Sequence, residues 1–334
     1  MQVQSAFSSI LPPFQPSIHS RQSNRTWYQT TPPLFPLFPR KRFYKSRGAF
    51  CIGLSSALLS PTRSPMSLAK RAVYPTQPVP LRKEVARLLR DAPAHHGDQG
   101  DILALVVPDT NRLGAGSVAA HAYSMLRAEI EHDGPYQTVI IISPSHDGAF
   151  GRLAIARADH YHTPLGPVAV NDALRNELCD EDDDIFLDDS GHYHTEGVDV
   201  QLPFLLEIMG VEDGEPAFDI VPIVMGDESP DLCRELGTAV GEVMYGRRAL
   251  VIATADVLDV EDEAWTAFTE ALGAYNISEL MHLLRTDAMH VEGMGAVLVA
   301  MLAAQHRGAT KADLMAHQKP QEGCPGAMAI AFRR

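Results

Sequence analysis

The stretch VIIISPSHDG, residues 139–148, decides the fold. Its first four residues, Val139 to Ile142, are all apolar, which is typical of a strand in the middle of a parallel sheet covered on both faces. The next three residues, SPS, break the pattern, and His146 is the first ionisable side chain beyond the strand. Ligands of open α/β sheets bind at the carboxyl ends of the strands, so His146 is a candidate site residue. The alternative is an ordinary loop whose histidine only caps a helix.

Two further apolar runs end in the same way. ILALVV at 102–107 is followed by Pro108 and Asp109, and ALVIA at 249–253 precedes a segment that contains Asp256 and Asp259. Apolar residues recur at helical spacing between these runs. Strands that alternate with helices in this way predict an α/β fold, a single layered domain with a central, mostly parallel sheet flanked by helices. No linker or change of composition interrupts residues 69–334, which we assign to this one domain.

The first 65 residues form a basic leader. No acid occurs before Glu84, and twelve of the 28 Lys and Arg residues precede it. A Ser-rich, Arg-rich and acid-poor leader is typical of a transit peptide, which would place the protein in a mitochondrion or plastid; without it we expect a cytoplasmic protein. The alternatives are a start assigned too early, with Met66 as the true start, and a signal or anchor segment at 49–59. That segment is shorter than the roughly 20 residues that a spanning helix needs.

The remainder of the chain is strongly acidic, with sixteen Lys and Arg against all 42 acids. Such a surface repels phosphate backbones and anionic lipid, which argues against nucleic acids and membrane surfaces as partners. We expect a small molecule or a peptide as ligand in the crevice, and no membrane span. The four cysteines are scattered without a CxxC motif, as in a reducing compartment. The sequence contains no nucleotide-binding GxGxxG after a strand, no phosphate-binding loop and no GxSxG elbow.

The residue types at these strand ends permit a metal site. Asp109, His146 and His290, which lies in the segment DAMHVEG, have the composition of a 2-His-1-carboxylate triad, the set suited to non-haem Fe(II). Fourteen histidines allow many other sets, so composition alone does not select this one. Two competing pairs, His160 with His162 and His192 with His194, are better explained as solvated loops beside turns.

Several segments together resemble the Memo family, whose bacterial and archaeal members are called AmmeMemoRadiSam system protein B. The similar segments, in order, are LVVPDTNRLGAGSVAAHAY, IISPSHDG, YHTPLGPVAV, VDVQLPFLLEIMG, DIVPIVMG and AMAIAF. The resemblance covers essentially everything after residue 70. It implies a fold shared with class III extradiol-type, non-haem iron dioxygenases, and a crevice able to hold a metal.

The resemblance also suggests site residues, although the chain departs from the family pattern. The family's metal-site histidine in SPSH is kept as His146, whereas the histidine of PHAG is replaced by Asp109. His290 stands where many members have a cysteine. Asp256 is retained, and Asp259 replaces a histidine that is the expected acid or base. The family's EHS reads Thr195, Glu196 and Gly197 here.

Two functions are compatible with these changes. The first is a divalent-metal-dependent, dioxygenase-like oxidoreductase acting on a small organic substrate. Asp109, His146 and His290 would hold the metal, with Fe(II) favoured; Asp256 would orient a ligand or accept a proton, and Glu196 and Asp259 would line the rim. The second is a non-catalytic adaptor or peptide-binding module on the same scaffold, with a degenerate metal site. The loss of the histidine at Asp259 favours the second, and the metal-binding residue types at all three ligand positions favour the first.

Overall fold

The computed structural model describes residues 75–94, 100–110, 115–146, 148, 150–181, 185–189, 191–212, 214–286 and 289–334. The chain divides into Met1–Ser60 and Pro61–Arg334, and every described residue belongs to the second of these units. The predicted leader, residues 1–65, lies outside the described residues.

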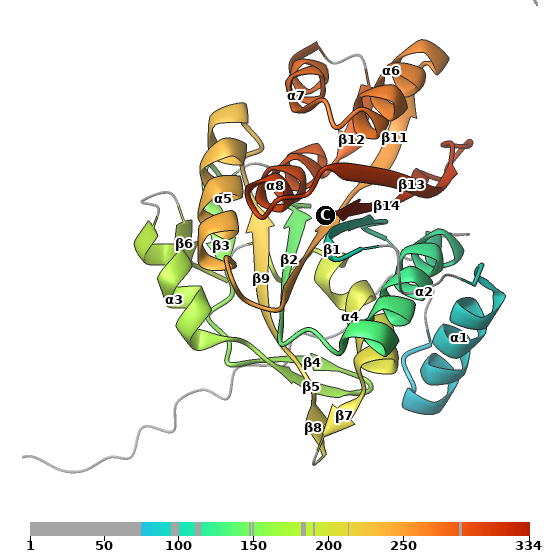
Figure 1. The fold of residues 1–334 in the computed structure, drawn as a ribbon, viewed down its shortest axis with the longest axis vertical. Coiled ribbons are helices and arrows are strands. Elements are labelled where there is room, and N and C mark those ends of the chain that lie inside the picture. The colour runs from blue at the N-terminus through green and yellow to red at the C-terminus, as the bar shows by residue number, and fades with distance from the viewer. Residues whose placement is uncertain are drawn as a thin grey trace, which may run out of the picture. The chain divides into compact units, whose positions relative to one another are not determined.

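The described part of the chain contains a ten-stranded sheet in the order β12-β11-β14-β1-β10-β2-β9-β3-β6, with β13 paired to β14 (Figure 1). Its strands are β1 (Ile102–Val107), β2 (Thr138–Pro144), β3 (Leu153–Ile155), β6 (Ile185–Leu187), β9 (Asp219–Met225), β10 (Ala249–Thr254), β11 (Asp256–Val260), β12 (Met289–Glu292), β13 (Lys311–Gln318) and β14 (Gly326–Arg333). Two small hairpins are β4 (His160–Thr163) with β5 (Gly166–Ala169), and β7 (Val211–Glu212) with β8 (Glu215–Pro216).

The centre of the sheet consists of β1, β10, β2 and β9, which are parallel neighbours. Antiparallel pairing begins on either side of this group, where β14 joins β1 and β3 joins β9. The three apolar runs of the sequence are β1, β2 and β10, and each of their residues is buried. The predicted α/β fold with a layered, mostly parallel sheet is therefore confirmed.

Helices cover both faces of the sheet (Figure 1). One face is covered by α1 (Pro78–Asp91), α2 (Ala115–Asp133) and α4 (Gly197–Met209), and the other by α3 (Asp172–Glu181), α5 (Pro230–Val243), α6 (Asp262–Gly273), α7 (Ile277–Thr286) and α8 (Met294–His306). The side chains of β2 alternate between the two cores: Val139 and Ile141 pack with the first set, Ile140 and Ile142 with the second. This period of two explains why the run carries no polar residue, since neither face of the strand meets water.

None of the helices in the described ranges is long and apolar enough to cross a membrane.

Candidate functional site

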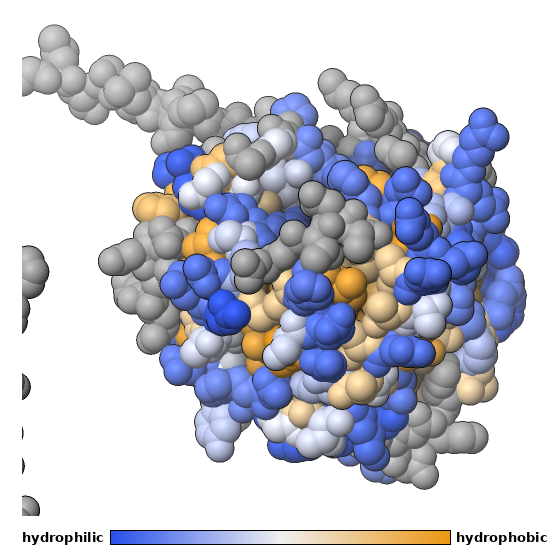
Figure 2. All heavy atoms as spheres, turned by 90° about the horizontal axis from the view of Figure 1, so that it is seen from above, coloured by the Kyte–Doolittle hydropathy of each residue, from blue (hydrophilic) through white to orange (hydrophobic). Residues whose placement is uncertain are grey.

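Parallel strand order brings the predicted residues to one edge of the sheet. Val107 of β1 pairs with Thr254 of β10, and β10 lies directly beside β2. Asp109, Asp256 and His146 each follow the carboxyl end of one of these strands. Figure 2 faces this end of the molecule, toward which the arrows of β2 and β9 point in Figure 1. Polar side chains dominate the view, with apolar ones among them near its middle.

The centre of the site is a hydrogen-bonded pair. Nε2 of His146 lies 2.6 Å from Oδ2 of Asp109, whose side chain is completely buried. The other carboxylate oxygen of Asp109 accepts a hydrogen bond from the Thr254 hydroxyl. The hydrogen bond and the charge of Asp109 raise the pKa of His146 to about 9, against the opposing effect of burial. His146 is therefore an imidazolium at neutral pH unless another cation takes the place of its proton.

Asp256 holds the Asp109 loop in place. One oxygen of Asp256 accepts the backbone N–H of Asp109 at 3.0 Å, and the other accepts the hydroxyl of Thr110 at 2.8 Å. Burial raises the pKa of the Asp256 carboxyl, and the nearby Asp109 carboxylate raises it further. Asp256 therefore fixes the backbone of Asp109, while its predicted role toward a ligand or a proton stays a prediction.

Two glutamates that the sequence did not single out complete the site. Oε1 of Glu292, at the end of β12, lies 3.9 Å from Nε2 of His146, and Glu292 pairs with Asp256 across β11 and β12. Glu228 accepts the backbone N–H of Gly295 at 2.7 Å, at the start of α8. Burial, together with the charges of Asp109 and Glu292, raises the pKa of Glu228 to about 7. Three carboxylates, Asp109, Glu292 and Asp256, therefore act on one imidazole, and the charge of Glu228 interacts with two of them. Such an arrangement attracts cations.

His290 is placed differently from Glu292. It lies two residues earlier on β12, is exposed, and pairs with Asp259 rather than Asp256. Two residues of a strand span roughly 6.6 Å, so these two side chains reach different points along β11. Among the described residues, Asp109, His146 and His290 do not form a group whose ligand atoms all lie within 4.8 Å of one another.

The two predicted rim residues lie on β11 and directly before α4. Asp259 is exposed on β11, opposite His290. Glu196 is partly buried directly before the first residue of α4. Neither makes a hydrogen bond or ion pair to His146 or Asp109 within the described ranges, so their roles stay predictions.

Gly197 allows α4 to begin against the centre of the site. A Cβ at this position would collide with the Asp109 carboxylate and the Ser143 hydroxyl, and would lie 2.7 Å from Oγ1 of Thr254. Only a residue without a side chain permits this approach. The start of α4 therefore helps to fix the Asp109 carboxylate from the side opposite to His146.

The other histidine pairs fall outside this cluster. His160 and His162 are exposed, as predicted, but they lie on one face of the strand β4 and not in a loop. His192, by contrast, is buried, with Nε2 3.0 Å from the carbonyl of Ala154. Burial lowers its pKa to about 4, so this histidine is neutral. The solvated-loop interpretation was therefore wrong for His192, because the turn that carries it packs against β3.

The group that does have metal-ligand spacing among the described residues lies elsewhere. Ligand atoms of Asp101, Glu129 and Asp133 lie within 4.8 Å of one another, at the amino end of β1. The Glu129 oxygens already accept hydrogen bonds from Tyr136 and from the backbone N–H of Ile102. Three acidic residues that share existing partners do not by themselves make a metal site.

The fold and the site define an α/β protein with a histidine–carboxylate cluster at the carboxyl edge of its parallel strands. The sequence model of the Memo-like protein family matches residues 65–323, most of the chain, and the chain belongs to this family. The family resemblance seen in the sequence is therefore confirmed.

Two MEMO1 family proteins agree with this assignment. A MEMO1 family protein of Sulfolobus acidocaldarius is 28% identical, over 70% of this chain and 85% of the relative. One of Ignicoccus hospitalis is 31% identical, over 64% and 74%. The crystal structure of an uncharacterized protein from Escherichia coli K12 is similar with a TM-score of 0.49 at 11% identity, covering 69% of this chain and 99% of that chain.

Proposed function

We propose that this protein binds a divalent metal ion in the crevice and acts as a dioxygenase-like oxidoreductase on a small organic substrate. The observation that carries the proposal is the position of His146 Nε2, 2.6 Å from an Asp109 oxygen and 3.9 Å from a Glu292 oxygen. The two carboxylates come from different strand ends and both approach this nitrogen, although the three side chains do not form a group whose ligand atoms all lie within 4.8 Å of one another in the described residues.

The chemistry of the donors fits a divalent cation. One imidazole nitrogen with carboxylate oxygens favours Fe(II) or Mn(II) over softer metals such as Cu(I). The carboxylates are crowded: burial and neighbouring negative charge raise the pKa values of both Asp256 and Glu228. A bound cation would relieve this repulsion more fully than the single charge of His146 does.

For the third ligand we favour Glu292 over His290. Glu292 lies within reach of His146, and a small movement of a partly exposed glutamate brings its oxygen into a shared coordination sphere. His290 pairs with Asp259, farther along the hairpin. In this arrangement Asp109, His146 and Glu292 hold the metal.

The remaining residues have supporting roles. Asp256 orients Asp109 through its backbone N–H, and its raised pKa suits it to accept or release a proton near neutral pH. Glu228 is anchored by the start of α8 and contributes negative charge. A bound Fe(II) would supply the redox chemistry of oxygen-dependent oxidation, because three protein ligands leave positions open.

One observation favours the second candidate, a non-catalytic adaptor or peptide-binding module. Both Asp109 oxygens have hydrogen-bond partners within the protein, His146 and Thr254. Such a closed pair is stable without a metal, as expected for a degenerate site that retains only its scaffold.

Metal analysis separates the two candidates. The full chain, purified without chelator, should contain about one equivalent of a divalent metal. We expect His146→Ala and Glu292→Gln to lose it and His290→Ala to keep it. His160→Ala is the control, because this histidine is exposed on β4 and lies outside the cluster. Substoichiometric metal in the parent protein, or metal unaffected by His146→Ala, would leave the adaptor as the better account.

A further inference from the structure

A cavity lies at the opposite edge of the sheet from the His146 cluster. It has a volume of about 380 Å³ and is lined where β1 and β10 begin, at Ile102 and Ala249. Asp109 follows the other end of β1, roughly 20 Å away at about 3.3 Å per residue. This cavity therefore neither belongs to the proposed metal site nor depends on it.

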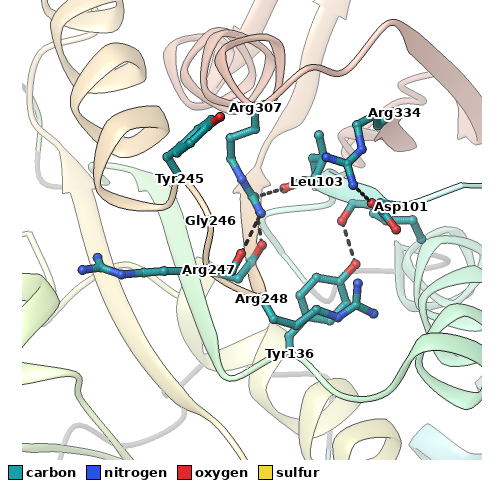
Figure 3. A pocket seen from close by; sticks show the side chains of 11 residues that line it. Asp101, Leu103, Tyr136, Tyr245, Gly246, Arg247, Arg248, Arg307 and Arg334 are labelled. Carbon is teal, nitrogen blue, oxygen red and sulfur yellow. Dashed lines mark hydrogen bonds and ion pairs between the residues drawn. The ribbon is translucent and has the colours of Figure 1, made fainter.

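Four arginines line the cavity, and Arg307 is the central one. Its guanidinium donates hydrogen bonds to the carbonyls of Ala249 at 2.8 Å, Arg247 at 3.2 Å and Leu103 at 3.4 Å. Figure 3 shows it extending between these strand ends. A guanidinium has five N–H donors, so these three bonds fix its plane and leave donors for a ligand. In the part of the chain that the structure describes, Arg307 forms no ion pair with a carboxylate.

Each of the other three arginines has an acidic partner. Arg334 pairs with Asp101, Arg248 with Glu129 at 3.1 Å, and Arg247 with Glu177 at 2.9 Å. Arg247 points away from the cavity in Figure 3, whereas Arg248 lies over the ring of Tyr136. Because the positive charge of each of these three arginines is balanced by its acidic partner, the charge of Arg307 is the unbalanced one among the four arginines of the cavity. Burial lowers the pKa of Arg307, and the positive charges of Arg334 and Arg248 lower it further, against the opposing effect of Tyr136 and Asp101.

From this charge and geometry we infer that the cavity binds a small phosphate-bearing molecule. A planar guanidinium matches the oxygens of a phosphate group, and Arg334, which is 61% exposed at the rim, is free to turn toward a ligand. The cavity volume suits a small molecule. Tyr245, whose side chain is 74% exposed beside Arg247, offers a flat apolar surface to the rest of the ligand. The acidic surface of the rest of the domain disfavours a nucleic acid strand, whose many phosphates would extend beyond the cavity.

Titration calorimetry with inorganic phosphate, on the full chain at low ionic strength, tests this site. We expect saturable binding that Arg334→Gln weakens about tenfold, the effect of losing one charge-assisted hydrogen bond. Arg307→Gln should abolish binding. Arg234→Gln is the matched control, since Arg234 is 57% exposed, also pairs with one aspartate and lies outside the cavity. His146→Ala should bind phosphate like the parent protein.

Several results would overturn the inference. The first is the absence of saturable phosphate binding, and the second is equal weakening of binding by Arg234→Gln and Arg334→Gln. The third is loss of binding in His146→Ala, which would place the anion at the His146 site. Arg307 also ties together three backbone segments, so its substitution could unfold the protein. The exposed Arg334 variant keeps the test decisive in that case.

Discussion

The hydrogen bond between His146 and Asp109 should make folding stability depend on pH. In the folded protein the pKa of His146 is raised to about 9 from the ordinary 6.5, chiefly by this hydrogen bond. A difference of about 2.5 pKa units corresponds to about 3 kcal/mol of unfolding free energy, at 1.36 kcal/mol per unit. Because the folded state holds the proton more tightly, this stabilisation is complete below pH 6.5 and disappears as the pH rises through 9.

Urea denaturation of chelator-treated protein at pH 6, 7.5 and 9 measures this dependence, since a bound metal would add its own stabilisation. The parent protein should lose stability steadily between pH 6.5 and 9. The His146→Ala variant should be less stable at pH 6 and nearly flat over the same range. Parallel profiles for the two proteins would refute the reasoning, because they would mean that His146 does not share its proton with Asp109 in the folded state.

Three further substitutions probe the surroundings of the site. Gly197→Ala should lower the free energy of unfolding by about 1–3 kcal/mol, because the new Cβ collides with the Asp109 carboxylate. Gly273→Ala is the control and should leave stability unchanged, because open space surrounds this glycine. Equal effects of the two substitutions in thermal unfolding would contradict this. The pKa of Glu228 is raised to about 7, so ionisation of this carboxyl destabilises the folded parent protein as the pH rises from 4.5 to 7. Glu228→Gln should therefore be more stable than the parent at pH 8 by a larger margin than at pH 4.5. The same pH profile of urea unfolding in both proteins would contradict this. Deletion of residues 1–65 should leave the unfolding temperature unaltered, since their sequence has no core-forming period; a large drop would show that the domain begins earlier.

The fold could be predicted because the central parts of its middle strands consist of apolar residues alone. The apolar runs 102–107, 139–142 and 249–253 lie within β1, β2 and β10 and contain no polar residue, and such short runs are typical of strands covered on both faces. The breakers that follow them placed Asp109, His146 and Asp256 at the correct edge. That Asp109 and His146 touch could not be predicted, because contact depends on strand order, and spacing along the chain does not determine which strands are neighbours.

Glu292 was missed for a different reason. A histidine two residues earlier, His290, matched a familiar ligand set, while a glutamate in an acidic chain attracts no notice. Only the pairing of β12 with β11 places Glu292 opposite Asp256. One signal was present in the sequence. Glu292 is the last residue of its strand and is followed by a glycine and a helix, and residues at the ends of strands are the ones that lie at the ligand-binding edge of such sheets. The arginine-lined cavity gave no such signal, since its residues come from distant segments of the chain.

The most direct test of the proposed metal site is to locate the ion. Crystals of the full chain soaked in Mn(II) should give one strong anomalous peak within about 2.0–2.3 Å of His146 Nε2 and of carboxylate oxygens from Asp109 and Glu292. A peak between Asp101, Glu129 and Asp133 instead, or no peak in the crevice at saturating Mn(II), would contradict the account.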